Sequence, residues 1–305
     1  MSAFYSPSRY LGSLALLLVS TSWLSLAAED KKPEAATAPV TQGQKVATCG
    51  HSFHYFMPAI LKELAKAGDI KGHEQVGESY IGGSRIIQHW DVPAEKNKVK
   101  ELLKAGKVDI LTLAPIHLPD EGIENFVKLA TENNPNVRIT IQENWLPFDI
   151  YDVTFKQRPP KVDHNALNGE QLWKLHEPYF TGMDDHAREL NKKVGKDAVY
   201  IVPVGQAVIA LREKVIAGQA PSIKVQEDLF TDPIGHAKAP IMLLNAYCHY
   251  AVIYRKSPVG LPAPDILKKA KLGDDEEKLN TLLQELAWGA VTKHPLSGVK
   301  VEAKP

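Results

Sequence analysis

The stretch "KVATCGHSFHYF", residues 45–56, decides how this 305-residue chain folds. Its first five residues suit a β-strand, and residues 53–68, "FHYFMPAILKELAKAG", carry apolar side chains at helical spacing and close on a glycine. A strand that passes through a tight turn into a helix is the repeating unit of a parallel sheet. Ser52 lies in the turn that joins the two.

Four more stretches predict strands, and helical patterns follow them. The run "KVDILTLAP" is continuously apolar, as a strand buried on both faces must be. The predicted strands lie within residues 73–83, 107–115, 136–145 and 198–205, and the helices within 94–106, 121–133, 181–195 and 206–218. This alternation predicts an α/β fold, a three-layer α/β/α sandwich around a central, mainly parallel five-stranded sheet.

Three later segments depart from this repeat. Residues 151–177 are rich in proline and histidine, and we expect an excursion from the sheet, since long loops carry lids and binding surfaces. The stretch 239–262 contains a helix that is apolar nearly all round, which predicts a central position. A final helix within 274–295 has acidic residues in its first turn, where the helix dipole favours them.

The N-terminal residues predict export. Residues 1–28 combine Arg9, a long apolar run and the small-residue pattern Ser25-x-Ala27, as a signal peptide does; left uncleaved, they would form an N-terminal anchor. Residues 29–44 are rich in Ala, Pro, Thr and charge and predict a disordered linker. Residues 45–305 then form one domain, and we expect it to be secreted or periplasmic.

Composition limits the kinds of molecule that the chain is expected to bind. Thirty-six basic and 36 acidic residues leave no net charge to attract nucleic acid or an anionic membrane, so a small or neutral partner is expected. The two cysteines, Cys49 and Cys248, exclude a disulfide scaffold. Export permits a bridge between them, and two buried thiols are the alternative.

Ser52 allows two interpretations. It follows the first strand at the carboxyl edge of the sheet, where parallel sheets bind ligands, and helix N–H groups near it could stabilise an oxyanion. Serine is also among the best residues for capping a helix. The segment "FTDPIGHAKAP", residues 230–240, brings in Asp232 and His236, the types that a serine nucleophile needs as orienting carboxylate and general base. Taken singly, they suit a turn before proline and a helix start.

These positions together resemble the SGNH (GDSL-like) hydrolase superfamily. It has a serine just after the first strand, a glycine after the second, and an aspartate and histidine near the C terminus. The blocks "YIGGSRIIQHW" (80–90), "VDILTLAP" (108–115), "EGIENFVKLA" (121–130) and "YRKSPVGLP" (254–262) are similar to an uncharacterised exported bacterial branch of it. The resemblance covers residues 45–295 and implies a flavodoxin-like SGNH fold.

The resemblance also implies roles for individual residues. Ser52 would be the nucleophile, His236 the general base and then acid, and Asp232 the carboxylate that orients it. The backbone N–H of Gly83, or of its neighbour Gly82, would join that of Ser52 in an oxyanion hole. An ordinary turn is the alternative for this glycine pair. No cofactor is required.

Three features depart from the superfamily. His51 stands where an acidic residue usually precedes the serine, and Asp232 and His236 are four residues apart instead of three. The asparagine expected after the third strand is missing, and only His117 is available there. Asn144, after the fourth strand, could supply a substitute amide, although a turn or capping role suits it equally.

Other polar and aromatic residues are assigned to the pocket or to the surface. We expect His51, His54, His117 and Trp145 to line the substrate pocket, with Trp145 as a platform for a sugar. The pair His51-x-x-His54 could hold a metal, but no third ligand follows in a zinc spacing, so no metal site is expected. The histidines of the excursion and the helix after it are expected to be solvated: His164, His176 and His186.

The sequence thus predicts an exported serine esterase. It would cleave an ester, such as an O-acetyl group, of a carbohydrate or another small polar molecule through an acyl-enzyme. The alternative is a catalytically eroded module of the same fold that binds a glycan or an exported partner.

Overall fold

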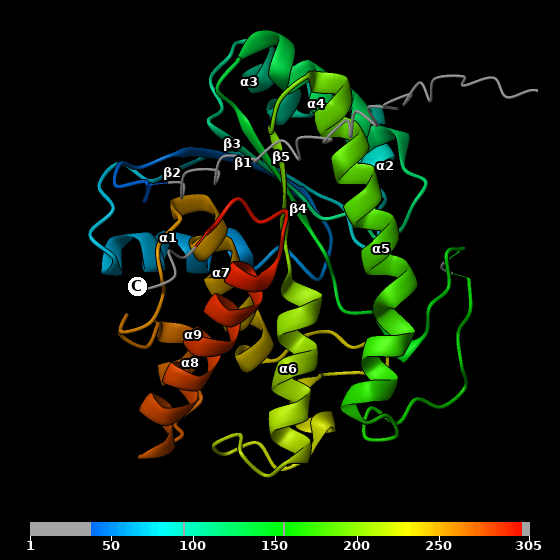
Figure 1. Cartoon of the computed structure of the whole chain (residues 1–305), viewed down its shortest axis with the longest axis vertical. Helices are drawn as coiled ribbons and strands as arrows, with labels where there is room; N and C mark the ends of the chain where they lie inside the picture. Colours follow the sequence, from blue (N-terminus) through cyan, green and yellow to red (C-terminus); the bar gives the residue numbers. More distant parts are fainter. Residues whose placement is uncertain (1–37, 94, 155, 301–305) are drawn as a thin grey trace, which may run out of the picture. The chain divides into compact units, whose positions relative to one another are not determined.

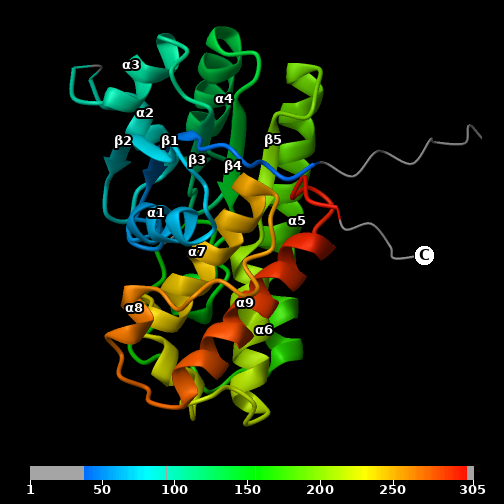
Figure 2. The ribbon, with the colours of Figure 1, turned by 90° about the vertical axis from the view of Figure 1, so that its left-hand side faces the viewer.

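The computed structural model describes residues 38–93, 95–154 and 156–300, which all belong to one unit, residues 36–305. The predicted signal and most of the predicted linker, residues 1–37, lie outside the described residues. Five strands form one sheet in the order β2-β1-β3-β4-β5, which Figure 2 shows from left to right. Their bounds are β1 Lys45–Gly50, β2 Glu74–Tyr80, β3 Ile110–Leu113, β4 Arg138–Gln142 and β5 Val199–Val202.

Every pair of neighbouring strands is parallel. The carboxyl ends therefore meet at one edge, and the strand order is that of a flavodoxin-like sandwich, in which ligands bind beside the first strand. The predicted α/β fold with a five-stranded parallel sheet is confirmed.

Helices cover both faces of the sheet, and each set encloses its own hydrophobic core. Figure 1 shows α1, α7, α8 and α9 gathered at one side and α2 to α5 at the other. The first face carries α1 Met57–Ala67, α6 Val204–Ile216, α7 Ala239–Tyr254, α8 Asp265–Lys268 and α9 Asp275–Lys293. The second carries α2 Ile86–Asp91, α3 Lys98–Lys104, α4 Glu121–Asn133 and α5 Gly169–Val194.

The central helix is α7, as its sequence predicts. Its side chains are buried nearly all round, between α1, α6 and α9. Two short 3₁₀ turns, Pro147–Asp149 (η1) and Gln226–Leu229 (η2), lie in the loops after β4 and α6. Among the described residues, no helix is both long and apolar enough to cross a bilayer.

The excursion is shorter than the sequence indicates, because α5 begins at Gly169 and only residues 151–154 and 156–168 are described as loop. Asn168 caps the helix, and its side chain and that of Gln171 form a reciprocal capping box. Pro178 sits inside the helix, where one missing backbone donor does not end it. The prediction that the helix resumes only after residue 177 is wrong for this reason.

The two cysteines are free and fully buried. Cys49 packs in the core on the α2–α5 face, and Cys248 packs in the core on the α1–α9 face. Burial raises the pKa of both thiols. The alternative of two buried thiols holds, and the bridge does not form.

Candidate active site

Ser52 does not cap a helix. The turn that follows β1 runs from Ser52 to Phe56, and α1 begins at Met57 with Phe56 as its N-cap residue, which makes no side-chain capping bond. Two backbone bonds to the His51 carbonyl, from His54 at 2.9 Å and Tyr55 at 3.0 Å, shape the turn. The Ser52 hydroxyl is therefore left for another partner.

That partner is His236, from the loop between η2 and α7. Ser52 Oγ lies 2.9 Å from His236 Nε2, and His236 Nδ1 lies 2.5 Å from Asp232 Oδ2. The structure thus brings together a hydroxyl, an imidazole and a carboxylate in the order that an activated serine requires.

Gly235 allows the loop to place His236 four positions after Asp232. This glycine has φ +94°, in the left-handed region that side chains disfavour. Asp232 Oδ1 accepts bonds from the backbone N–H of Gly235 at 3.1 Å and of His236 at 3.2 Å. Burial raises the pKa of Asp232, but the hydrogen bonds from His236 and Gly235 outweigh it and hold that pKa below its ordinary value. The carboxylate is therefore ionised at neutral pH.

Residues around the Ser52–His236 contact carry backbone N–H groups without partners among the described residues. Within the described part of the chain, the N–H groups of Ser52, Gly82 and Gly83 donate to no other residue. Gly83 has φ +63°, and nothing would obstruct a Cβ there, so backbone conformation and not space requires the glycine. Asn144 is buried nearby; its side-chain amide donates to the Pro115 carbonyl at 2.8 Å, across the end of the neighbouring β3.

These groups open onto a pocket of about 410 Å³ at the carboxyl edge of the sheet. Its walls are mainly apolar, with Arg158 stacked on the Phe148 ring at the loop after β4. The lining residues are His51, Ser52, Phe53, Tyr80, Gly82, Gly83, Ile116, Asn144, Trp145, Pro147, Arg158, Ile234 and His236.

Two of the expected pocket residues lie elsewhere. His54 is fully buried beneath the turn, where its ring nitrogens meet Gln142 at 2.6 Å and Thr112 at 3.2 Å. His117 faces a separate cavity of about 20 Å³. Neither side chain lines the main pocket: polar partners hold His54 beneath the turn, and His117 packs at the other cavity.

Trp145 lines the pocket but cannot act as a sugar platform. It is 2% exposed, and Phe53 stacks on its ring with centroids 4.4 Å apart and planes 6° apart. Its indole Nε1 donates to the Gly235 carbonyl at 2.8 Å. Trp145 therefore supports the loop that carries His236, and the platform prediction is wrong.

His51 stands in the pocket wall as a neutral ring. Its Nδ1 accepts the Phe53 N–H at 3.3 Å, which leaves the proton on Nε2. The Nε2 atom is buried without a hydrogen-bond partner among the described residues. Burial, with nearby histidines, lowers the pKa of His51 to about 3, so the ring is uncharged at neutral pH.

A buried polar cluster centred on Gln142 lies under the Ser52 turn. The Gln142 Oε1 atom meets His54 at 2.6 Å, Asn245 at 3.0 Å and His249 at 3.0 Å. Its Nε2 donates to the Phe53 carbonyl at 3.1 Å and to Asn144 Oδ1 at 2.5 Å. This residue at the end of β4 thus ties the turn to the asparagine beside the pocket.

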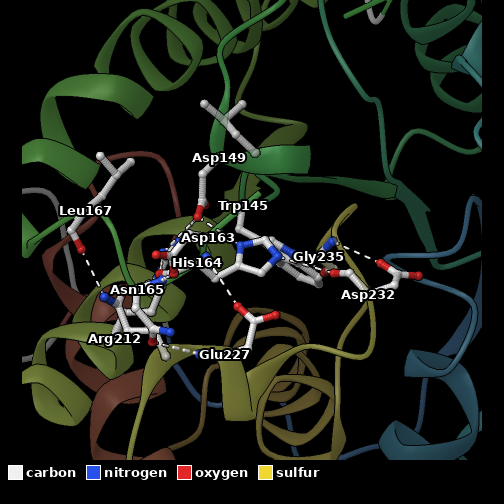
Figure 3. A network of polar contacts seen from close by, with 12 residues as sticks. Trp145, Asp149, Asp163, His164, Asn165, Leu167, Arg212, Glu227, Asp232 and Gly235 are labelled. Atoms are coloured by element: carbon white, nitrogen blue, oxygen red, sulfur yellow. Dashed lines mark hydrogen bonds and ion pairs between the residues drawn. The ribbon is translucent and has the colours of Figure 1, made fainter. Parts of the chain in front are cut away.

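A second, charged network lies behind the His236 loop and is drawn in Figure 3. Arg212, on α6 and 1% exposed, forms a bidentate pair with Asp149 at 2.6 and 2.9 Å. His164 Nδ1 contacts the same carboxylate at 2.9 Å, and its Nε2 lies 3.3 Å from the Asp232 carbonyl oxygen. The network therefore ends on the backbone of the orienting carboxylate (Figure 3).

The prediction that the histidines of this region are solvated is wrong for His164 and His176, each 1% exposed, while His186 is half-buried. Sequence reasoning also missed Arg212, Asp149 and Gln142. Arg212 carried a usable signal, since it lies four residues after Val208 and three before Val215, on the apolar face of α6. A cation on such a face must find a buried anion.

Side chains of metal-ligating types gather closely at one place within the described residues. Neither His51 nor His54 belongs to a close group of three ligands within the described ranges; Glu143, Asp184 and His294 do, with ligand atoms within 4.8 Å of one another. His294 Nδ1 accepts the Leu296 N–H at 3.2 Å, so its Nε2 carries the proton that faces the two carboxylates. The Nε2 atom lies 3.4 Å from Asp184 Oδ1 and 3.7 Å from Glu143 Oε2, within ion-pair range but without a hydrogen bond. This is not the pattern of a metal-bound histidine, which donates through its other nitrogen.

No protein-family model matches the chain, and no curated protein sequence matches it significantly. A solved DUF4886 family protein from Bacteroides uniformis is similar in structure, with 15% identity over 83% of this chain and 95% of its own, and a TM-score of 0.52. A protein from Parabacteroides merdae, provisionally named a GDSL-like lipase, is 14% identical over 70% of this chain and 97% of its own, with a TM-score of 0.41. At such identities, the likeness to the first shows a shared fold alone.

Proposed function

We propose that the protein is a serine ester hydrolase of the SGNH type. The observation that carries this proposal is the pair of contacts at His236: 2.9 Å from Nε2 to Ser52 Oγ and 2.5 Å from Nδ1 to Asp232. An imidazole so placed can accept the serine proton, and the carboxylate fixes its tautomer and stabilises the imidazolium that forms.

The reaction would proceed in two steps. Ser52 Oγ attacks the ester carbonyl carbon while its proton passes to His236 Nε2, and the imidazolium returns that proton to the departing alcohol oxygen. An acyl group then remains on Ser52. Water attacks it with His236 again as base, the bond to Ser52 Oγ breaks, and the serine takes the proton back as the acid leaves.

The oxyanion would be stabilised by backbone donors. The N–H groups of Ser52 and Gly83, or of Gly82 in its place, carry no other bond within the described residues and open onto the pocket. Asn144 and His51 line the same pocket. Asn144 stands beside the end of β3, after which the superfamily has its asparagine, so it is the candidate substitute.

The pocket suits a small ester. Its volume of about 410 Å³ and its apolar wall of Phe53, Trp145 and Ile234 accommodate a short acyl chain, with the carbonyl at Ser52. A polar alcohol such as a sugar, and export from the cytoplasm, are parts of the same proposal that rest on the sequence.

Covalent labelling tests the proposal. A fluorescent alkyl phosphonate should label the wild-type protein and a Ser257→Ala control, whose serine is exposed far along the chain, but not Ser52→Ala. Hydrolysis of p-nitrophenyl acetate should fall on the order of 10⁴-fold or more in Ser52→Ala. Folded wild-type protein that takes no label and shows no turnover would exclude the hydrolase.

The second candidate is a binding module with an eroded site. It is favoured by one feature: Asn144 Nδ2 already donates to the Pro115 carbonyl at 2.8 Å, so this candidate oxyanion donor is partly engaged. Glycan-array binding that is the same in wild type and Ser52→Ala, with no turnover in either, would support this candidate.

A further inference from the structure

Two tyrosines beside the pocket are unusually exposed. Tyr55, in the turn after Ser52, is 55% exposed, and Tyr80, the last residue of β2, is 54% exposed. These are the two most exposed large apolar side chains in the part of the chain that the structure describes. Exposed aromatic rings in contact mark binding surfaces more often than scattered single residues do.

The two rings form one continuous surface. Their centroids lie 5.4 Å apart, with the planes tilted by 47°. Because β1 and β2 are neighbours in the sheet (Figure 2), the turn after one strand and the end of the other meet at this edge. Tyr80 also lines the pocket together with Ser52 and Gly83, so the surface starts at the reacting centre.

The chemistry of this surface is amphipathic. Neither phenol hydroxyl bonds to another residue within the described ranges, so each pairs a ring face with a free donor and acceptor. An aliphatic chain gains most from a site closed to water, whereas these rings are more than half open to it. A sugar ring offers both C–H faces for stacking and hydroxyls for hydrogen bonds.

We propose that Tyr55 and Tyr80 form a stacking subsite for the sugar ring of a carbohydrate ester whose ester group lies at Ser52. This inference rests on the proposed function for the position of the ester. It assigns to these tyrosines the platform role that buried Trp145 cannot fill. The occupant is the sugar itself, not an acyl chain.

Binding is measured first without turnover. In a Ser52→Ala background, glucose pentaacetate and peracetylated cellobiose are titrated by calorimetry. Tyr55→Ala or Tyr80→Ala should each raise the Kd by about 5–10-fold, while Tyr→Phe variants keep most of the affinity because the ring remains. Trp173→Ala is the matched control, since it removes a partly exposed aromatic side chain on α5 that does not line the pocket.

Turnover separates this inference from the proposed function. With active serine, the ratio of kcat/KM for glucose pentaacetate to that for methyl acetate should fall about 5–10-fold in the Tyr→Ala variants, mainly through KM. If the protein hydrolyses methyl acetate but the Tyr→Ala variants change neither sugar-ester binding nor this ratio, the subsite is overturned and the hydrolase is not. No binding of either acetylated sugar would also overturn the subsite, and loss of methyl acetate hydrolysis bears on the hydrolase instead.

Discussion

Ser52 and His236 meet in one pocket, but the residues that support them differ in charge. Beneath Ser52, Gln142 gathers neutral partners such as His54 and Asn245. Behind Asp232 and His236, the support is ionic, with Arg212 and Asp149 forming a buried bidentate pair. The turn with Ser52 therefore rests on neutral hydrogen bonds, and the loop with His236 rests on a buried ion pair.

Because of this difference, the two supports should fail at opposite ends of the pH range. Burial lowers the pKa of His54 to about 4, so the folded protein favours the neutral form of this ring. For His164, burial acts in the same direction, but Asp149, the Asp232 carbonyl and Glu227 outweigh it and raise the pKa. Acid should weaken the first support and alkali the second.

The largest effect is expected from breaking the ion pair with Arg212→Met. The change leaves the buried Asp149 carboxylate without its bidentate partner and with His164 alone, and removal of one partner of such a buried pair costs about 3–5 kcal/mol of unfolding free energy. Arg212→Lys should restore little, because an ammonium cannot make the bidentate contact. Urea denaturation measures the loss as a lower midpoint.

The control for this variant is Lys193→Met, which removes surface ion pairs with Glu124 and Glu189. Its midpoint should stay at the wild-type value, since exposed pairs contribute little. Equal midpoints for Arg212→Met and Lys193→Met would show that the buried network does not hold the fold.

The next effect concerns the neutral support in acid. His54 takes up a proton more readily unfolded, near its ordinary pKa of about 6.5, than folded, near about 4. Its contribution to stability is therefore lost as pH falls from about 6.5 towards about 4, at up to about 1.4 kcal/mol per pH unit. His54→Gln should flatten the fall of the unfolding free energy over this window. The loss that it removes amounts to about 2 kcal/mol at about pH 5.

Urea titrations at several pH values measure this slope. The comparison is His164→Gln. The pKa of His164 is raised and not lowered, so this variant should show the wild-type dependence of stability on pH in acid. An unchanged slope in His54→Gln would show that His54 is not the group whose protonation destabilises the fold in acid.

Local patterns in the sequence predicted much of this fold and site. Apolar periodicity is a short-range property, and it gave the five strands, the central α7 and the turn with Ser52. Ser52, Asp232 and His236 were found because each follows a recognisable strand end or turn. The predicted roles of these three residues stay predictions until turnover is measured.

The buried residues that support Ser52 and His236 could not be predicted in the same way. Gln142 and Asn245 are 103 residues apart in the chain, and Arg212 and Asp149 are 63 apart, so only the packed fold pairs them. His164 is polar and lies in a loop, which indicates a solvated side chain; burial between α6 and the His236 loop reverses that expectation. Partner choice for buried polar groups is a property of packing and not of local pattern.

A smaller effect is expected from the charged support in alkali. The charged His164 ring donates to both Asp149 and the Asp232 carbonyl, and a neutral ring can donate only one of these bonds. Because its pKa is raised when folded, this stability is fully present below the ordinary value of about 6.5 and is lost as pH rises through the folded pKa. The loss should be about 1 kcal/mol, the net contribution of one hydrogen bond.

Unfolding free energies measured between about pH 6.5 and pH 8.5, below the titration of the buried tyrosines, check this prediction in wild type and His164→Gln. The decline should be absent from the variant. His186→Gln is the control, since burial lowers the pKa of this half-buried histidine and confines its titration to acid. A decline of equal size in both variants would show that His164 is not the titrating group.

The smallest expected change tests the backbone on which the charged support acts. No residue from Ser52 to Phe56 has a positive φ, whereas Gly235 sits at +94°, so only the His236 loop needs a glycine. A Cβ at Gly235 would meet no atom closer than 3.5 Å, so the cost of Gly235→Ala is conformational, about 1 kcal/mol. If the protein is the proposed hydrolase, the turnover of this variant should fall further than its stability, because the Gly235 N–H bonds to the Asp232 carboxylate.

Gly182→Ala is the matched control for this last prediction. Gly182 lies in α5 with no atom within 4 Å of an added Cβ, and alanine there should raise stability by about 0.5–1 kcal/mol through helix propensity. The same added methyl group should therefore lower stability at Gly235 and raise it at Gly182. If Gly235→Ala were as stable and as active as wild type, the left-handed residue would not be what allows the four-residue spacing, and the ionic network alone would have to position the loop.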